Sequence, residues 1–491
     1  MIRLSASDFY DLFRPTKCPG RVYLRYKGEP EAPPGPYDEV TRKLGQRHEE
    51  AHLQKFAKFV DISTGAVENR EIRTREEIGK KSPVLYHSLL RTKYRLGSKE
   101  VEIIGEPDFM IFDENGYVIR DSKISRNITE KEHPEILRQL EIYGWLYYQM
   151  FRIPPVRLEV HSGKNEIVPI TYDNGAMALS VLHELLKIKE LAAEAYNPVG
   201  WTKCGGCPFN YRCWTAAEKE LDVALLPGVD QGLAIALHQE GTKNVHDLLA
   251  VFAERSLAEF KRPWGDKTQR VGKKAESIMR IAHCFANGKE ILLQPPDIPG
   301  FPNYVMFDLE GMPPYLDELD KIYLWGLQVY GEEKGRHTPA VAGFGEKGDE
   351  DGWNGFLKNA EGILKQYPDI RFIHWHHYER VRIDMYVERY GDPKGVAAHV
   401  RKNLLDLLPI CQNSIALPLP SYSLKVVEKY AGFQRTQDEY GGDWAMAKYI
   451  EATELEDAEA RDEVMDEILK YNEEDLAATW HVLQWLKSKR K

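Results

Sequence analysis

A proline-rich stretch in the second half of the chain sets the main constraint on its fold. Residues 292–303 read LLQPPDIPGFPN and contain four prolines. Because proline has no backbone N–H and a fixed φ, this stretch cannot continue a helix or a central strand. We therefore predict a linker here, with a separate domain on each side. The length agrees, since 491 residues are too many for one ordinary domain.

The composition is that of a folded protein. The chain is 43% hydrophobic and 11% aromatic, which is enough for packed cores. It has no apolar run of membrane-spanning length, and its first residues lack the features of a secretion signal. We therefore expect a soluble, cytoplasmic protein with no membrane partner. No Gly-x4-Gly-Lys-Ser/Thr loop is present, so we expect no nucleotide-driven motor.

The charge is acidic, with two local basic stripes. A net charge of −10 argues against a passive coat for nucleic acid over the whole surface. Local stripes can still hold phosphates, although a charge run is more often an ordinary solvated surface. The first stripe comprises Arg70, Arg73, Arg75, Lys80 and Lys81. The second comprises Lys261, Arg262, Lys267, Arg270, Lys273, Lys274 and Arg280.

Acidic residues beside a lysine mark a first candidate site. Residues 101–112 and 117–125 are predicted as two strands joined by a turn at 113–116. Residues two apart on a strand share a face, so Asp121 and Lys123 project together. Asp108, near the middle of the first strand, can face them across the hairpin. Two carboxylates and a lysine suit Mg²⁺ or Mn²⁺, with a cation that orients water or stabilises a phosphate oxyanion.

Two predicted helices accompany this hairpin. The downstream helix, from residue 138, places Gln139 and Tyr143 four apart and hence on one face. The upstream segment GQRHEEAHLQKF places His48 and Glu49 on another helix. His52 lies on the same helix and is a second candidate histidine.

The order of these motifs resembles the RecB-like branch of the PD-(D/E)xK nucleases. The motifs are Gly-x-x-x-His, Gly-x-x-Asp, Asp-x-Lys and Gln-x-x-x-Tyr, and His52 does not fit the first of them. The resemblance implies a restriction-endonuclease-like core within residues 1–218. It implies metal ligands at His48, Asp108 and Asp121. It also implies catalytic roles for Lys123, Gln139 and Tyr143.

Three cysteines lie close together after this core, at Cys204, Cys207 and Cys213. A redox dithiol would need only Cys204 and Cys207, whereas zinc would need a fourth ligand. An iron–sulfur cluster also needs four ligands, and thiolates are its natural ones. The remote Cys18 can supply the fourth in either case. Cys284 and Cys411 stand alone, and we expect them to be packing residues.

The cysteine pattern resembles that of the iron–sulfur RecB-family nucleases. These include the AddB-type nuclease domain and the CRISPR-associated four-cysteine nucleases. The resemblance implies a 4Fe–4S cluster that ties the start of the nuclease domain to its end. The implied ligands are Cys18, Cys204, Cys207 and Cys213. Zinc on the same residues is the alternative.

The middle region, residues 219–291, has a helical pattern. Residues 226–229 read LPGV and are followed by an Ala/Leu-rich helix and a second glycine turn, which resembles a helix–hairpin–helix. In that motif a glycine turn lets backbone N–H groups approach a DNA phosphate. The alternative is a plain two-helix connector. With residues 271–274 as a second hairpin, we expect Gly228, Lys273 and Lys274 to bind nucleic acid.

A second candidate site lies beyond the linker. Residues 304–311 read YVMFDLEG, and Asp308 and Glu310 share one face of this predicted strand. Near the C-terminus, a predicted helix places Tyr471 and Asp475 four apart on one face. Two metals about 3.5–4 Å apart require several converging carboxylates, and these residues supply three of them.

This second set resembles the ribonuclease-H-like DEDD exonucleases of the tyrosine subtype. The resemblance implies a ribonuclease-H-like α/β domain with 3′–5′ exonuclease activity over residues 304–491. It implies metal ligands at Asp308, Glu310 and Asp475, with Tyr471 positioning the attacking water. The fourth carboxylate departs from the family pattern, because residues 374–379 read HWHHYE where Asn-x-x-Phe-Asp is usual. Glu379 then replaces an aspartate as a metal ligand, and Asp406 is the alternative.

Both resemblances together predict an α/β multidomain fold. They imply a RecB-family nuclease with a C-terminal ribonuclease-H-like exonuclease domain. We expect it to use Mg²⁺ or Mn²⁺ to hydrolyse DNA, at single-stranded ends, in repair, CRISPR adaptation or phage defence. Its expected partners are DNA and a helicase or another CRISPR or repair protein. The alternatives are a DNA-end-binding scaffold with one active domain and an RNA-directed nuclease.

Overall fold

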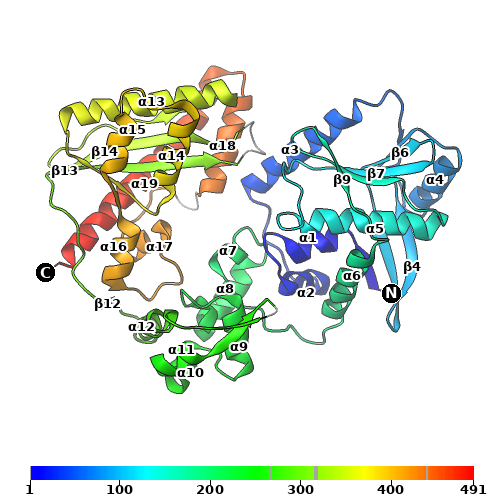
Figure 1. Ribbon diagram of the computed structural model, residues 1–491, viewed down its shortest axis with the longest axis horizontal. Coiled ribbons are helices and arrows are strands. Elements are labelled where there is room, and N and C mark those ends of the chain that lie inside the picture. The colour runs from blue at the N-terminus through cyan, green and yellow to red at the C-terminus, as the bar shows by residue number, and fades with distance from the viewer. Residues whose placement is uncertain (1, 266, 314–318, 438–440, 491) are drawn as a thin grey trace. The chain divides into compact units, whose positions relative to one another are not determined.

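The computed structural model describes residues 2–265, 267–313, 319–437 and 441–490, which form two compact units (Figure 1). The N-terminal unit comprises Met1–Pro34, Thr41–Asn197 and Thr202–Arg212. The C-terminal unit comprises Gly35–Val40, Pro198–Trp201 and Cys213–Lys491. The mixed α/β class predicted from the sequence is confirmed. The domain boundaries at 1–218, 219–291 and 304–491 stay predictions.

Two sheets form the N-terminal unit. The larger contains β2 (Val60–Asp61), β3 (Val84–Tyr86), β6 (Phe109–Asp113), β7 (Gly116–Ser122), β8 (Arg157–His161) and β9 (Ile167–Ile170), in that order. The smaller has the order β1 (Ile2–Ser5), β5 (Lys99–Gly105), β4 (Leu90–Leu96). Strand β7 pairs antiparallel with β6 and parallel with β8, which places it inside the larger sheet.

Helices cover these sheets. Those contributing residues to the unit are α1 (Ser7–Phe13), α2 (Pro19–Lys27), α3 (Pro36–Leu53), α4 (Val67–Gly79), α5 (Pro134–Phe151), α6 (Ala176–Lys189), α7 (Trp201–Cys204) and α8 (Asn210–Glu220). The apolar helix α5 is buried around most of its surface. Its Leu140 and Tyr143 share one hydrophobic core with Tyr117 and Ile119 of β7. Since side chains alternate along a strand, Asp121 projects from the same face as Tyr117 and Ile119.

The position predicted for Asp108 within its strand is wrong. Residues 101–112 form two strands in different sheets, β5 and β6, and Asp108 immediately precedes β6. The break falls at Pro107, which has no N–H to donate to a neighbouring strand. Asp108 therefore lies at the end of a strand, where its backbone N–H can bind a side chain.

A five-stranded mixed sheet organises the C-terminal unit (Figure 1). Its order is β15 (Ala340–Val341), β14 (Lys321–Gly331), β13 (Asn303–Met312), β16 (Arg371–His374), β17 (Leu404–Asp406). Strand β13 is antiparallel to β14 and parallel to β16, and β16 is in turn parallel to β17. The predicted strand at 304–311 is confirmed, and β14 is its antiparallel neighbour.

The alternating side chains of β13 feed two different cores. Val305, Phe307 and Leu309 pack in one core with helices α13 (Gly345–Gln366), α14 (Tyr378–Tyr390) and α15 (Val396–Lys402). Tyr304 and Met306 pack in another with α16 (Leu407–Ser414), α17 (Leu424–Tyr430) and the long α19 (Ala458–Ser488). Even-numbered residues of β13 therefore face α19. Asp308 and Glu310 are even-numbered, so they lie on the face that α19 covers.

The middle region has a core of its own within the C-terminal unit. Its elements are η1 (Val223–Leu225), α9 (Gln231–Gln239), α10 (Val245–Val251), α11 (Glu254–Glu259), β10 (Lys261–Trp264), β11 (Lys267–Arg270) and α12 (Lys274–Asn287). The hairpin β10–β11 was not expected from the helical pattern, but Pro263 and Gly265 are incompatible with a continuous helix. Beyond it, β12 (Ile291–Leu292) pairs with β18 (Ile415–Ala416).

Helix α18 (Gly442–Glu454) precedes α19 in the C-terminal unit and packs against it. None of the helices in the described ranges has both the length and the apolar character needed to span a membrane.

Candidate active sites

Backbone hydrogen bonds fix the two aspartates of the N-terminal site. The N–H of Asp108 donates to Asp121 Oδ1 at 3.0 Å, and the N–H of Ser122 donates to Asp108 Oδ2 at 2.7 Å. Lys123 follows β7, and its Nζ lies 3.0 Å from Asp121 Oδ2. The structure thus brings together the three residues that the Asp-x-Lys pattern singled out.

The charged groups at this site shift the pKa values of Asp108 and Lys123. Burial raises the pKa of Asp108 to about 7, and repulsion from Asp121 adds to this effect. Burial alone would lower the pKa of Lys123, but Asp121 and Asp108 outweigh it and raise that pKa above its ordinary value. Lys123 therefore stays protonated, whereas Asp108 is a carboxylate that a cation would stabilise. This donor set fits a divalent metal.

Gln139 and Tyr143 form a pair on α5, as their spacing predicted. Gln139 Nε2 donates to the Tyr143 hydroxyl at 2.8 Å. Burial, and then the charge of Asp121, raise the pKa of Tyr143 well above its ordinary value, so the hydroxyl stays protonated. A Cβ at Gly105 would lie 2.6 Å from Tyr143 Cδ1, so only glycine lets this ring pack against β5. Gly105 is the first residue of the Gly-x-x-Asp motif.

His48 lies against His161, and its implied role as a metal ligand stays a prediction. Its Nε2 lies 3.4 Å from the backbone oxygen of His161, and its ring stacks on the His161 ring at 4.3 Å. The ligand atoms that do come within 4.8 Å of one another belong to Glu49, His87 and Asp108. Sequence analysis gave no role to His87, and its position between two strand-like runs carries no motif.

Three carboxylates converge in the C-terminal site. Asp308 and Glu310 come from β13 and Asp475 from α19, and their carboxylate oxygens lie within 4.8 Å of one another. Glu310 and Asp475 are buried and Asp308 is half-buried. Burial, followed by repulsion from Asp475, raises the pKa of Asp308 well above its ordinary value. Burial and repulsion from Asp308 do the same for Glu310.

This electrostatic conflict fits a metal site. Carboxylates that repel one another away from water are costly unless a cation joins them. The three carboxylates offer only oxygen atoms as ligands, and oxygen ligands suit Mg²⁺ and Mn²⁺. The residues present therefore fit the divalent ions that the sequence predicted.

A chain of hydrogen bonds orients Asp308. Asn472 Nδ2 donates to Asp308 Oδ2 at 2.8 Å, and His337 Nε2 lies 3.0 Å from Asn472 Oδ1. Burial lowers the pKa of His337, so the ring is neutral, and its Nε2–H can donate to the amide oxygen. Gly326 lies opposite Asp308 on β14, and a Cβ there would lie 1.9 Å from Asn472 Oδ1. Sequence analysis missed these residues, although a lone glycine inside an apolar strand signals close approach of another group.

Positive charge also reaches the C-terminal site. Arg435 pairs with buried Glu428 through Nε at 2.6 Å and Nη2 at 2.9 Å, and Nη2 also contacts Asp475. Lys425 Nζ lies 4.9 Å from the centre of the Tyr471 ring. Burial, and then the charge of Asp475, raise the pKa of Tyr471, so its hydroxyl remains a proton donor.

Two residues compete for the fourth carboxylate. Glu379 is buried in the first turn of α14, where its Oε2 lies 3.1 Å from His374 Nδ1, and its charge contributes to the raised pKa of Asp308. Asp406 caps α16, because its Oδ1 accepts the N–H groups of His376 at 2.9 Å and Leu408 at 3.0 Å. The geometry favours Glu379, and its role as a ligand stays a prediction.

The cysteines do not form a compact group. No three of the six, all of which lie in the described part of the chain, bring their sulfur atoms within 4.8 Å, and none forms a disulfide. Cys18 and Cys204 are buried, and Asn197 Nδ2 donates to Cys18 Sγ at 3.1 Å. The Cys207 N–H donates to the Cys204 oxygen at 3.1 Å, which closes a turn between these two. The 4Fe–4S cluster therefore stays a prediction.

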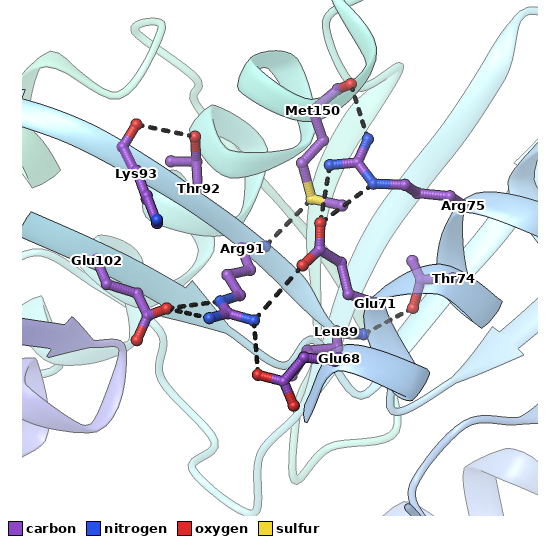
Figure 2. Close-up of polar contacts among 10 residues, drawn as sticks. All are labelled: Glu68, Glu71, Thr74, Arg75, Leu89, Arg91, Thr92, Lys93, Glu102 and Met150. Atoms are coloured by element: carbon purple, nitrogen blue, oxygen red, sulfur yellow. Dashed lines mark hydrogen bonds and ion pairs between the residues drawn. The ribbon is translucent and has the colours of Figure 1, made fainter. Parts of the chain in front are cut away.

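Much of the first basic stripe is paired within the protein. Arg70 is buried and pairs with Glu106 at 2.6 Å. Figure 2 shows Arg75 and Arg91 both directed at Glu71, with distances of 3.0 and 3.8 Å. Lys80 pairs with Glu77 at 2.6 Å. Arginines engaged in this way are poor candidates for a phosphate track.

The two predicted hairpins of the middle region differ at their helix starts. Gly228 has φ +96°, and a Cβ there would lie 3.1 Å from Ile278 Cγ1. Asp230 caps the following α9 and pairs with Arg262, so a carboxylate already occupies that helix N-terminus. At α12, the N-cap Lys273 makes no side-chain capping bond and Lys274 begins the helix. The second hairpin is thus the better phosphate candidate.

Family comparisons agree with both sites. A family model described as PD-(D/E)XK nuclease superfamily matches residues 16–214, and one described as RNase_H superfamily matches residues 305–487. A solved structure titled "Crystal structure of SSO0001" is 16% identical, covers 36% of this chain and 96% of its own, and has a TM-score of 0.20, too low to define a fold. No curated protein matches the chain significantly.

The two family matches and the two acidic sites define a nuclease with two nuclease-superfamily domains. The chain carries a PD-(D/E)XK nuclease superfamily domain at its N-terminus and an RNase H superfamily domain at its C-terminus. The fusion predicted from the sequence motifs is thereby confirmed. Both superfamilies hydrolyse phosphodiesters and generally use divalent metals such as Mg²⁺ or Mn²⁺.

Replacing Gly326 should disturb Asp308 through Asn472. Gly326→Ala puts a methyl group where the Asn472 amide lies, so we expect a loss of about 1–3 kcal/mol in unfolding free energy. We also expect weaker Mn²⁺ binding, because Asp308 loses its orienting donor. Chemical denaturation and calorimetry measure the two effects. Gly362→Ala is the control, since its Cβ points into open space on α13 and helix propensity favours alanine by about 1 kcal/mol. Unchanged stability and metal affinity in Gly326→Ala would contradict the packing described here.

Neutralising Asp308 should stabilise the metal-free protein. Its pKa is raised in the folded state, so stability is lost as pH rises from the ordinary carboxyl range through the folded value. Asp308→Asn should therefore raise the melting temperature at pH 7, by about 2–4 °C per kcal/mol gained, and change little near pH 4. With Mn²⁺ the order should reverse, because only the wild type gains stability by binding. Exposed Asp369→Asn is the control. A fall in the metal-free melting temperature of Asp308→Asn would refute the predicted electrostatic strain.

Proposed function

We propose that this chain is a metal-dependent deoxyribonuclease with two phosphodiesterase sites that trims single-stranded DNA ends. The observation that carries the proposal is the convergence of Asp308, Glu310 and Asp475, whose close oxygens suit divalent metals. Burial and mutual repulsion raise the pKa values of Asp308 and Glu310. The second support is the pair of family matches, since both superfamilies are nucleases.

In the C-terminal site, Asp308, Glu310 and Asp475 would hold the metal, with Glu379 as the proposed fourth ligand. When bound, the metal supplies a polarised phosphate and a more acidic water. Tyr471 keeps its proton and is one helical turn from Asp475, so its hydroxyl can orient the attacking water. The hydrogen bond from Asn472 prevents rotation of the Asp308 carboxylate. We propose 3′–5′ exonuclease activity for this site.

In the N-terminal site, Asp108 and Asp121 would hold the metal that activates water. Lys123 stays protonated beside Asp121, so it can donate to a phosphoryl oxygen as negative charge develops there. Gln139 holds the Tyr143 hydroxyl next to the same carboxylates, and the pair can position the scissile phosphate. We propose that the exposed Lys273 and Lys274, beside the uncapped N-terminus of α12, bind the DNA backbone.

A DNA-end-binding scaffold with a single active domain is the second candidate. The contact between Arg435 and Asp475 favours it, because a guanidinium there neutralises a carboxylate that a metal would need. An RNA substrate is the third candidate, since folds of this class act on either nucleic acid. One assay distinguishes both candidates from the proposed deoxyribonuclease. Single- and double-stranded DNA and RNA, labelled at each end, are incubated with Mg²⁺ or Mn²⁺, and the products show substrate and polarity.

We also propose a 4Fe–4S cluster on Cys18, Cys204, Cys207 and Cys213. Cys18 and Cys204 are buried from solvent, and Asn197 donates to the Cys18 sulfur. Amides often donate in this way to thiolates that bind a metal. In such a cluster each cysteine binds a different iron, so its four sulfurs surround the cluster and lie farther apart than the ligands of a single metal ion. Repair, CRISPR adaptation or phage defence in the cytoplasm, with a helicase as partner, is the proposed setting.

The two sites should act independently. Lys123→Ala should lower the N-terminal activity by on the order of 10²–10³-fold, because one donor to the transition state is lost. Asp475→Asn should abolish the C-terminal activity and spare the first. The double variant should cleave no substrate in the end-labelled assay. Exposed Lys93→Ala is the control for Lys123→Ala. If either single variant removes both activities while folding normally, the proposal of two separate sites is wrong.

Iron should accompany the protein purified without oxygen. We expect a brown protein with about four irons per chain, measured by metal analysis. Cys204→Ser should lose the iron and lower the melting temperature, since the cluster would close a loop of nearly the whole first domain. Cys284→Ser should keep it, because that thiol donates to the Ala416 oxygen in another core. Stoichiometric zinc without iron would contradict the cluster.

A further inference from the structure

A stack of imidazole rings fixes the rotation of α3, the helix that carries the motif histidine. His48 and His52 lie four apart on α3, and both rings stack on His161, at centroid distances of 4.3 and 3.9 Å. Burial lowers the pKa of His52 to about 3 and of His161 to about 4, so these rings are neutral near pH 7. His52 also lies 3.1 Å from Arg120 through its Nε2.

This stack directs Glu49, the next residue of α3, toward the aspartates of the N-terminal site. Successive residues of an α-helix are about 100° apart, so a helix that presents His48 to His161 presents Glu49 elsewhere. Glu49 faces the site, where its Oε1 accepts the Tyr86 hydroxyl at 2.5 Å and lies 2.8 Å from His87 Nε2. Glu49, His87 and Asp108 each offer one ligand atom within 4.8 Å of the others.

The backbone at His87 is shaped for this arrangement. His87 has φ +52°, in the left-handed region that residues other than glycine seldom adopt. Its N–H donates to the Asp108 carbonyl at 2.9 Å, next to the antiparallel pairing of β3 with β6, so the same strand pair holds both residues. Unfavourable backbone conformations of this kind persist where the surrounding structure enforces them, and they are frequent at functional sites.

We propose that Glu49 and His87 bind the metal of the N-terminal site together with Asp108 and Asp121, and that His48 is a packing residue. This inference rests on the proposed nuclease function of that site. An imidazole among the carboxylates favours Mn²⁺ over Mg²⁺, because imidazole nitrogen suits transition metals while Mg²⁺ prefers oxygen. Without a metal, Glu49 and His87 pair with each other, which keeps both side chains in place.

Mn²⁺ binding to the full chain tests the assignment. Asp308→Asn combined with Asp475→Asn disables the C-terminal site, so the remaining Mn²⁺ reports on the N-terminal one. Calorimetry gives its Kd, and electron spin echo envelope modulation detects nitrogen from a coordinated imidazole. His87→Ala, His48→Ala and Glu49→Gln are then compared on this background. Glu50→Gln is the control for Glu49→Gln, because Glu50 lies on the same helix and is exposed.

We expect His87→Ala to lose the nitrogen signal, while His48→Ala keeps it. His87→Ala and Glu49→Gln should each raise the Kd by at least about ten-fold, since even outer-shell partners of metal ligands are worth 10–100-fold. Glu50→Gln should leave the Kd unchanged. If His87→Ala does not fold, Glu49→Gln carries the test, because glutamine keeps the size and the acceptor for Tyr86.

The opposite result overturns the assignment. If His48→Ala loses the nitrogen signal and His87→Ala keeps it, then the family histidine is the ligand and the Glu49–His87 pair is structural. A merely structural pair would lower the melting temperature without changing the Kd, which also contradicts the proposal. A background chain that binds no Mn²⁺ contradicts the proposed N-terminal nuclease site itself, a failure distinct from the wrong choice of ligand.

Discussion

Repulsion between buried carboxylates is the interaction on which the rest of the structure depends. In the C-terminal unit, Asp308, Glu310 and Asp475 are gathered close enough that burial and mutual repulsion raise the pKa values of the first two. Such a group persists only because the surrounding fold is strong enough to hold it. The apolar cores on the two faces of β13 provide that strength. Stability is thus given up locally for a site that a cation can complete.

The N-terminal unit meets the same problem with a fixed cation. Lys123 lies 3.0 Å from Asp121 and partly offsets the charge of Asp108, whose pKa is nevertheless raised to about 7. The C-terminal site also has a built-in positive charge, because Arg435 contacts Asp475 there. The two arrangements agree with the chemistry proposed for each: a lysine that stabilises a phosphate oxyanion in the N-terminal site, and three carboxylates that hold a metal in the C-terminal site.

Local periodicity explains why much of the fold could be predicted. The strand 303–312 and the helix 458–488 have long, regular patterns, so the faces of Asp308, Glu310, Tyr471 and Asp475 followed from spacing alone. The prediction for Asp108 was wrong because Pro107 ends one strand and separates two sheets, an effect of long-range pairing. The hairpin β10–β11 was missed for a different reason, because its short strands carry no apolar alternation.

The sequence by itself determined the two nuclease domains and the acidic residues that mark their sites, because motif order and strand or helix spacing are local properties. Only the tertiary structure decided which residues support those acids. Asn472 reaches Asp308 because Gly326, far away in sequence, leaves room for it. Glu49, rather than His48, faces Asp108 because stacking on His161 sets the rotation of α3. Both depend on contacts between segments that no sequence period connects, and packing alone fixes them.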